Sequence, residues 1–301
     1  METENNSKEI IIPQEAFDWY DEYAHGDIDR RTFLNRLAGL SGVVAGLTMG
    51  VLTSALLPNY ALAEQVSFND KDINASFTEF PSPKGLGTVR GYLVTPKTLA
   101  GKAPMVLVVH ENRGLNPYIK DVARRLAKQG FVAFAPDILH TLGGYPGNDD
   151  EGKKMQKSLD KAKVEQDFIA TANYLKSHEL SNGKLGAVGF CFGGYICNML
   201  AATIPETVDA VVPFYGTPPK TDVSKIKAPM MMHFGELDKR VNTTWLNYEP
   251  ALKENKVDYQ AFVHPGTNHG FHNDSTGRYV KDAAELAWSR TVGFFKEQIG
   301  S

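Results

Sequence analysis

From Thr88 onward the sequence alternates short apolar runs with longer amphipathic runs, and this alternation restricts the chain to very few folds. Residues 105–110 are a continuous apolar run rich in valine, as expected of a strand buried on both faces. Residues 117–130 follow, with apolar positions at helical spacing, a proline in the first turn and a glycine at the end. Strands alternating with helices predict an α/β fold with a mostly parallel sheet covered on both faces.

Further runs of strand length continue this alternation to the end of the chain. Helices are expected within residues 164–175 and over residues 279–298. No internal repeat or second pattern follows residue 64, so we expect residues 64–301 to form a single domain. The other expected strands are residues 88–94, 131–136, 185–190, 210–215, 230–234 and 259–264.

Residues 1–63 follow a different pattern, one typical of an export signal. Arg30 and Arg31 precede the uncharged segment 37–57, and residues 61–63 read Ala-Leu-Ala, the form of a cleavage site. We therefore expect a twin-arginine signal that is cut after Ala63. The twin-arginine export machinery would then be a partner, and the enzyme would be periplasmic.

Two alternatives to a cleaved signal stay open. Segment 37–57 is long enough to span a bilayer as an uncleaved anchor, with Gly42, Gly46 and Gly50 spaced for helix packing in lipid. The sequence before Arg30 is acidic, which is unusual for a signal and leaves room for a helix retained in the cytoplasm. Membrane contact is expected only through residues 37–57, and only if they are not removed.

The strand expected at residues 185–190 ends in a cysteine framed by glycines. The stretch GFCFGG places Cys191 between Gly189 and Gly193, just before an expected helix. This is the elbow G-x-nucleophile-x-G, with cysteine in the usual serine position. A helix N-terminus also favours the thiolate form. The alternative is a small buried hydrophobic residue, which is what we expect of Cys197.

A thiol nucleophile needs a base, and the base needs a carboxylate that orients it. Asp238 follows the run 230–234 and His269 follows the run 259–264, in the order nucleophile, acid, histidine of α/β-hydrolases. Glu236 is a competing acid and His272 a competing base. Asp238 taken alone is equally consistent with a cap of the following helix.

Two backbone N–H groups are expected to bind the oxyanion of the reaction. One belongs to Phe192, directly after the nucleophile, and the other to Asn112, in the loop after residues 105–110. Glu111 in the same loop is harder to explain, because a carboxylate near the thiol would raise its pKa. Its alternative role is to bind backbone N–H groups of the loop.

The sequence gives little support for a metal, a cofactor or a nucleic acid as a ligand. No histidines and carboxylates have the spacing of a metal site, so we expect no metal, and the sequence indicates no cofactor. The net charge is −3, and no basic run with interleaved aromatic residues appears. We therefore expect no nucleic-acid partner.

Four motifs, HENRGLN, GFCFGG, FGELD and NHGFH, together resemble the dienelactone hydrolase family of α/β-hydrolases over roughly residues 84–298. The resemblance implies the α/β-hydrolase fold and a small-molecule ester, lactone or thioester substrate cleaved through an acyl-enzyme. It implies Cys191 as nucleophile, His269 as base and Asp238 as orienting carboxylate. It also implies that Glu111 accepts the thiol proton when substrate binds.

The sequence departs from this family at the substrate carboxylate. Family members that open dienelactones hold that carboxylate with two arginines, one shortly after the strand expected at residues 131–136 and one four residues after the histidine. This chain has ILHTLGG at the first place and Asn273 at the second. We therefore do not expect a small anionic lactone. The next cation is Arg278, and the loop 140–150 is expected to border the pocket.

Two other functions remain as alternatives: a non-catalytic binding protein on the same fold, and a thiol-redox protein that uses Cys191. The redox function lacks a resolving cysteine. Cys197 lies six residues on, roughly 9 Å along a helix axis, beyond the reach of about 7 Å for a disulfide.

Overall fold

The computed structural model describes residues 12–41, 47–61 and 63–300. Eight strands form one sheet in the order β1-β2-β4-β3-β5-β6-β7-β8. The pairs β1/β2 and β2/β4 are antiparallel and all others are parallel, so the expected mostly parallel sheet is confirmed. The strands are β1 (Ile73–Ser82), β2 (Gly87–Pro96), β3 (Ala103–Val109), β4 (Val132–Asp137), β5 (Ser181–Phe190), β6 (Ala210–Phe214), β7 (Met230–Gly235) and β8 (Tyr259–His264).

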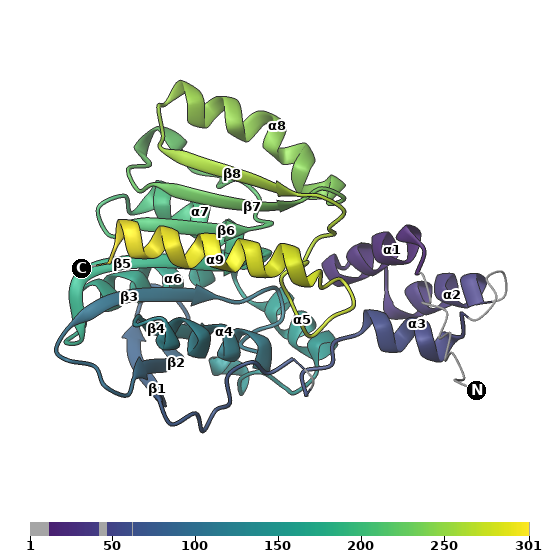
Figure 1. The fold of residues 1–301 in the computed structure, drawn as a ribbon, viewed down its shortest axis with the longest axis horizontal. Coiled ribbons are helices and arrows are strands. Elements are labelled where there is room, and N and C mark those ends of the chain that lie inside the picture. Colours follow the sequence, from purple (N-terminus) through teal and green to yellow (C-terminus); the bar gives the residue numbers. More distant parts are fainter. Residues whose placement is uncertain (1–11, 42–46, 62, 301) are drawn as a thin grey trace, which may run out of the picture.

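Helices cover both faces of the sheet, as expected (Figure 1). One apolar core lies between the sheet and two helices, and a second lies between the opposite face and three others. The first pair is α4 (Pro117–Lys128) and α9 (Lys281–Gln298); the other three are α6 (Lys161–Lys176), α7 (Phe192–Thr203) and α8 (Lys239–Glu254). A shorter helix, α5 (Asp149–Ser158), precedes α6.

How deeply a strand or helix is buried explains whether the sequence predicts it. Every residue of β3 and β4 is buried, and such strands read as continuous apolar runs. Strand β1 was not expected, because it pairs only with β2 and most of its residues are exposed. Helix α5 was not separated from the loop before it, because only Gly152 of this polar helix is buried.

Three helices from the N-terminal part form a small unit with its own apolar core. They are α1 (Gln14–His25), α2 (Arg30–Ser41) and α3 (Met49–Leu56). Phe33 is fully buried there and stacks on Tyr23, with ring centroids 4.9 Å apart. The unit lies at the end of the sheet where the parallel strands end (Figure 1). Its position matters because ligand sites of parallel sheets form at this edge.

The segment 37–57 contains the end of α2 and all of α3. Gly42 and Gly46, and Leu62 of the expected cleavage site, lie outside the described residues. Within residues 12–41, 47–61 and 63–300, no helix combines the length and the apolar character needed to cross a membrane. Cleavage after Ala63 and export stay predictions.

The core of the N-terminal unit yields a stability prediction. Replacing Phe33 by alanine should cost this unit about 3–5 kcal/mol, because a buried ring is lost and a cavity remains. Hydrogen exchange followed by mass spectrometry should show faster exchange in α1 and α2 and unchanged exchange in β3 and β5. The matched control is Phe68→Ala, since Phe68 is 71% exposed and should change nothing. Equal loss of protection in the sheet would contradict a separate unit.

Candidate active site

Cys191 stands at the turn between β5 and α7, in a strained backbone conformation. Its φ is 56° and its ψ is −110°, a region that residues other than glycine rarely adopt. Its N–H donates to the Phe214 carbonyl oxygen at 3.0 Å, which fixes the turn to β6. Cys191 occupies the N-cap position of α7. The positive end of the helix therefore lies beside the residue and favours a thiolate.

The glycines that frame Cys191 allow this strand and helix to cross closely. A Cβ atom at Gly189 would lie 2.1 Å from the carbonyl oxygen of Gly193. A Cβ atom at Gly193 would lie 2.3 Å from the carbonyl oxygen of Val109, at the end of β3. Both distances are far below van der Waals contact. The sequence pattern thus reflects a packing requirement as well as backbone freedom.

The structure brings Asp238 and His269 together. His269 Nδ1 donates to Asp238 Oδ2 at 2.6 Å, and both side chains are buried. Asp238 also caps α8, because its Oδ1 accepts from the Val241 N–H at 3.1 Å. The two interpretations of Asp238 are therefore compatible, since each uses a different oxygen. The hydrogen bond to Nδ1 leaves Nε2 of His269 to face other partners.

Cys191 and His269 also lie close together. The Cys191 sulfur and one ring nitrogen of His269 are within 4.8 Å of each other. Burial alone would lower the pKa of His269, but the charges of Asp238, Asp21 and the Cys191 thiolate outweigh it and raise the pKa to about 10. Burial alone would raise the pKa of Cys191, but the charges of His269 and His25 hold it well below its usual value. These charges favour a thiolate beside an imidazolium.

The two predicted oxyanion donors border the nucleophile. Phe192 is the first residue of α7, so its N–H has no acceptor within the helix. Asn112 follows β3 in the loop that faces this turn. Within the described residues, neither backbone N–H donates a hydrogen bond to another group. Both are therefore available to an oxyanion.

Glu111 is buried and held by the residue that replaces the family arginine. Its Oε2 accepts from Asn273 Nδ2 at 2.9 Å. Burial raises the pKa of the Glu111 carboxyl group, and the charge of Cys191 adds to this effect. Among the described residues no hydrogen bond joins Glu111 to Cys191. Asn273 thus fixes the orientation of Glu111 rather than offering a positive charge to a ligand.

The competing residues make other contacts. Glu236 accepts from the Gly266 N–H at 2.7 Å. His272 Nδ1 lies 2.7 Å from the Tyr118 hydroxyl, and burial lowers the pKa of His272 well below its usual value. Cys197 is fully buried in the core between the sheet and α7. Glu236, His272 and Cys197 are therefore not part of the group that Cys191 forms with Asp238 and His269.

Sequence reasoning missed one residue at this site, His25. Its Nε2 lies 3.4 Å from the Cys191 sulfur, and its ring meets the His269 ring edge-on with centroids 4.8 Å apart. His25 is the last residue of α1 and precedes Gly26, which ends the helix in the left-handed conformation. A histidine before a glycine carries no motif, so only the docking of α1 reveals this contact.

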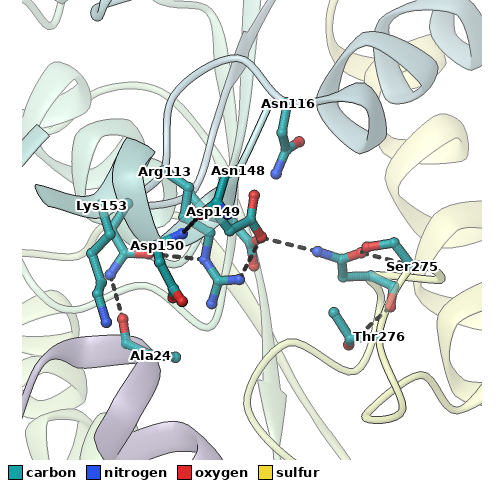
Figure 2. Close-up of polar contacts among 12 residues, drawn as sticks. Ala24, Arg113, Asn116, Asn148, Asp149, Asp150, Lys153, Ser275 and Thr276 are labelled. Carbon is teal, nitrogen blue, oxygen red and sulfur yellow. Dashed lines mark hydrogen bonds and ion pairs between the residues drawn. The ribbon is translucent and has the colours of Figure 1, made fainter. Parts of the chain in front are cut away.

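The loop 140–150 and Arg278 face α1 rather than the nucleophile. Arg278 Nη1 lies 3.4 Å from Asp21 Oδ1, and the guanidinium lies over the Tyr20 ring. Lys153 Nζ donates to the Tyr23 carbonyl oxygen at 2.6 Å, beside Ala24 in Figure 2. Arg113 Nη1 donates to Asp149 Oδ2 at 2.8 Å, and both residues are drawn in Figure 2. Residues of this loop line a pocket shared with the N-terminal unit, whereas the cavity beside the elbow is lined by residues outside the loop.

A cavity of about 430 Å³ opens beside the elbow. Both residues expected to bind the oxyanion, Phe192 and Asn112, contribute to its wall, as does His25. Leu159, Val164 and Tyr195 add apolar surface to the lining. The polar part of the lining includes Glu165 and four lysines, Lys153, Lys157, Lys161 and Lys220.

Comparison with known proteins agrees with the motifs. Residues 89–299 match the profile of the Dienelactone hydrolase family. The chain belongs to the dienelactone hydrolase family. It is an enzyme, a hydrolase acting on ester bonds, and the α/β-hydrolase fold is confirmed. A second profile, YqhI-like, matches residues 4–43, which include α1 and α2.

Several relatives of this family member share much of its sequence. The "putative hydrolase fragment YghX" of Escherichia coli is 59% identical over 114 residues, which is 38% of this chain and 97% of that protein. A "putative carboxymethylenebutenolidase" of Aquifex aeolicus is 40% identical over 69% of this chain and 93% of its own. A putative dienelactone hydrolase from Klebsiella pneumoniae superimposes with a TM-score of 0.65 at 26% identity, covering 74% of this chain and 99% of its own.

The charge state of Cys191 leads to a prediction for alkylation. Iodoacetamide should modify Cys191 at a nearly constant rate between about pH 6 and pH 9, because an ordinary thiol is mostly protonated below about pH 8.5 and this one is not. The raised pKa of His269, about 10, keeps the imidazolium in place across that range. In His269→Ala, His269 no longer offsets the effect of burial and only His25 is left to lower the Cys191 pKa, so the rate should fall on acidification within this range. A wild-type rate that falls in the same way would contradict the resting ion pair.

Proposed function

We propose that this member of the dienelactone hydrolase family cleaves an ester, lactone or thioester through a Cys191 acyl-enzyme, with Asp238 and His269 completing the triad. The observation that carries the proposal is the convergence of four loops, those after β3, β5, β7 and β8. They place the strained Cys191, the hydrogen-bonded pair Asp238–His269 and two free backbone N–H groups at one edge of the sheet. Nucleophile, base, orienting acid and oxyanion donors are what acyl transfer requires.

In the first half-reaction the Cys191 thiolate attacks the carbonyl carbon and forms a C–S bond. The carbonyl oxygen becomes an oxyanion, held by the N–H groups of Phe192 and Asn112. The intermediate collapses when the bond to the leaving group breaks, and His269 gives its proton to the departing oxygen or sulfur. Asp238 keeps Nε2 of His269 directed at the reaction, because it binds Nδ1.

In the second half-reaction water replaces the leaving group. Neutral His269 takes a proton from the water, the hydroxide equivalent attacks the thioester carbon, and the C–S bond breaks to restore the thiolate. Glu111 offers a further proton acceptor, since its raised pKa suits a carboxylate that takes up a proton near the thiol. Asn273 holds that carboxylate in place.

The acyl group of the substrate would occupy the cavity beside the elbow. Its apolar wall suits an aliphatic or aromatic acyl group, and its volume of about 430 Å³ suits one of moderate size. The four lysines in the lining suit a substrate that also carries a polar or anionic group. A carboxylate held by the family's two arginines has no counterpart here, because Asn273 binds Glu111. Substrate must also displace the ring of His25 from the sulfur.

The acyl-enzyme gives the direct test of this function. The full chain, mixed with p-nitrophenyl esters, lactones and thioesters of increasing acyl length, should release product and show a transient added acyl mass. Cys191→Ala should show neither, and Asp238→Asn should lose roughly 10³-fold or more in turnover, since the imidazole is then held in the wrong tautomer.

A matched control separates chemistry from folding. Glu236→Gln changes the neighbouring carboxylate, which contacts only the loop at Gly266, and should retain near wild-type turnover. Circular dichroism of all variants should be unchanged. Wild-type turnover in Cys191→Ala would refute the nucleophile. Absence of turnover and adduct across the whole panel would favour a binding protein on this fold.

We also propose that the chain is exported by the twin-arginine route to the periplasm. The support is the sequence Arg30–Arg31 before segment 37–57 and the exposure of both arginines at the start of α2. In a bacterial host, wild-type protein should appear in the periplasmic fraction, and replacement of both arginines by lysine should keep it in the cytoplasm. N-terminal sequencing of the exported protein would show whether it begins after Ala63. Equal distribution of both proteins would contradict export by this route.

A further inference from the structure

Helix α1 ends directly at the nucleophile. The carbonyl oxygens of its last turn accept hydrogen bonds from the main domain: Ala24 from Asn112 Nδ2 at 2.8 Å and Tyr23 from Lys153 Nζ at 2.6 Å. These donors bind carbonyl groups of the last helical turn, which lack the usual partner four residues on; the Tyr23 carbonyl also accepts from the Gly26 N–H at 3.1 Å. Gly26 then turns the chain away. Hydrogen bonds to the backbone of α1, and not only contacts of the imidazole ring, thus hold His25 at the sulfur of Cys191.

Three donor atoms meet at this point. One ring nitrogen of His25, one of His269 and the Cys191 sulfur all lie within 4.8 Å of one another. His25 Nε2 is 3.4 Å from the sulfur. In a tetrahedral zinc site, nitrogen at about 2.0–2.1 Å and sulfur at about 2.3 Å from the metal are roughly 3.5 Å apart. The pair His25–Cys191 already has this spacing, and His269 needs a shift of only about 1 Å.

Both histidines are oriented as metal ligands usually are. His25 Nδ1 lies 2.8 Å from the Asp21 carbonyl oxygen and 3.3 Å from its carboxylate. His269 Nδ1 is bound by Asp238. A carboxylate or carbonyl on the outer ring nitrogen is the common arrangement behind a zinc-bound imidazole. The inner nitrogen of His269, Nε2, is buried and has no hydrogen-bond partner within the described residues.

The donor set selects the metal. Two imidazoles and one thiolate form a borderline-soft set of three, which suits Zn²⁺ with water in a fourth position and does not suit Mg²⁺ or Ca²⁺. We propose that His25, Cys191 and His269 form a binding site for Zn²⁺, and that Zn²⁺ bound there blocks the nucleophile. The sequence shows no such spacing, because His25 and Cys191 are 166 residues apart.

One contact must change when zinc binds. Arg240 Nη2 lies 2.5 Å from His25 Nε2, so the guanidinium occupies part of the space in front of that nitrogen. The Arg240 side chain is 38% exposed, and its Nε lies 3.7 Å from Asp21 Oδ2. It can therefore turn toward Asp21 and solvent. Asp21 and Asp238 place a carboxylate behind each histidine, which favours a dication, and Arg240 and Arg278 both pair with Asp21.

Binding changes the protonation of the pair. Zinc forms bonds to the Cys191 thiolate and to Nε2 of both histidines, and each proton carried on Nε2 of His25 or of the His269 imidazolium leaves to solvent. No electron is transferred. The sulfur can then no longer attack a carbonyl. Loss of hydrolysis on zinc binding rests on the proposed function of Cys191, whereas zinc binding itself does not.

Co²⁺ serves as a spectroscopic probe of the proposed zinc site. Co²⁺ added to the metal-stripped full chain should bind one equivalent and give a thiolate-to-cobalt charge-transfer band with the intense visible bands of four-coordinate cobalt. Zn²⁺ should displace it. In His25→Ala the affinity for both metals should fall at least about 100-fold, because a ligand is lost. His25→Gln should behave in the same way and replaces His25→Ala if that variant does not fold. Cys191→Ser should abolish the charge-transfer band.

The control is His140→Ala, a partly exposed histidine away from these three donors, which should bind Co²⁺ and Zn²⁺ as wild type does. Absence of a thiolate–cobalt band in the wild type would overturn the proposal. Undiminished affinity in both His25 variants would overturn it as well, because the metal would then lie elsewhere.

Turnover of the metal-free chain separates this proposal from the proposed function. If metal-free protein hydrolyses esters and Zn²⁺ inhibits the wild type but not the His25 variants, both stand. If cobalt binds through His25 and no ester is cleaved by metal-free protein, the metal site stands and the hydrolase mechanism falls. If esters are cleaved and zinc does not inhibit at saturating occupancy, the inhibitory part of the proposal fails.

Discussion

The close crossing of β5 and α7 at Cys191 is the constraint on which the rest of the site depends. Gly189 and Gly193 permit it, because any side chain at either position would collide with backbone atoms. The crossing forces Cys191 into a positive φ and sets its sulfur at a helix N-terminus. The pair Asp238–His269 then meets that sulfur from two neighbouring strand ends. The strained turn thus brings Cys191 to the loop residues that are proposed to act with it.

The N-terminal helices add a second layer to the same site. Helix α1 reaches the sulfur through His25, and its last carbonyl groups are bound by Asn112 and Lys153. Asn112 therefore serves two elements: its side chain holds α1, and its N–H faces the expected oxyanion. Removal of residues 1–63 on export would take His25 away and open the cleft. In a chain that keeps them, His25 stays in contact with the sulfur of Cys191, the proposed nucleophile.

The sequence predicts those features that local patterns determine. Buried strands such as β3 read as apolar runs, and Cys191, Asp238 and His269 each follow one of them, so their positions could be stated in advance. Strand β1 lies at the edge of the sheet and most of its residues are exposed, so its sequence contains no continuous apolar run that would predict a strand. His25 was missed because its contact depends on how α1 docks on a cleft distant in sequence. The sequence shows that Asn273 stands where the family has an arginine, and only the structure shows that Asn273 donates a hydrogen bond to Glu111.

The central claim is that Cys191 attacks a carbonyl whose oxygen binds the N–H groups of Phe192 and Asn112. A crystal structure of the chain trapped with a slowly hydrolysed ester tests it most directly. The account predicts an acyl group on the Cys191 sulfur, with its carbonyl oxygen about 2.7–3.1 Å from both nitrogen atoms and the ring of His25 displaced. An acyl group on another residue, or a carbonyl oxygen turned away from both N–H groups, would contradict it.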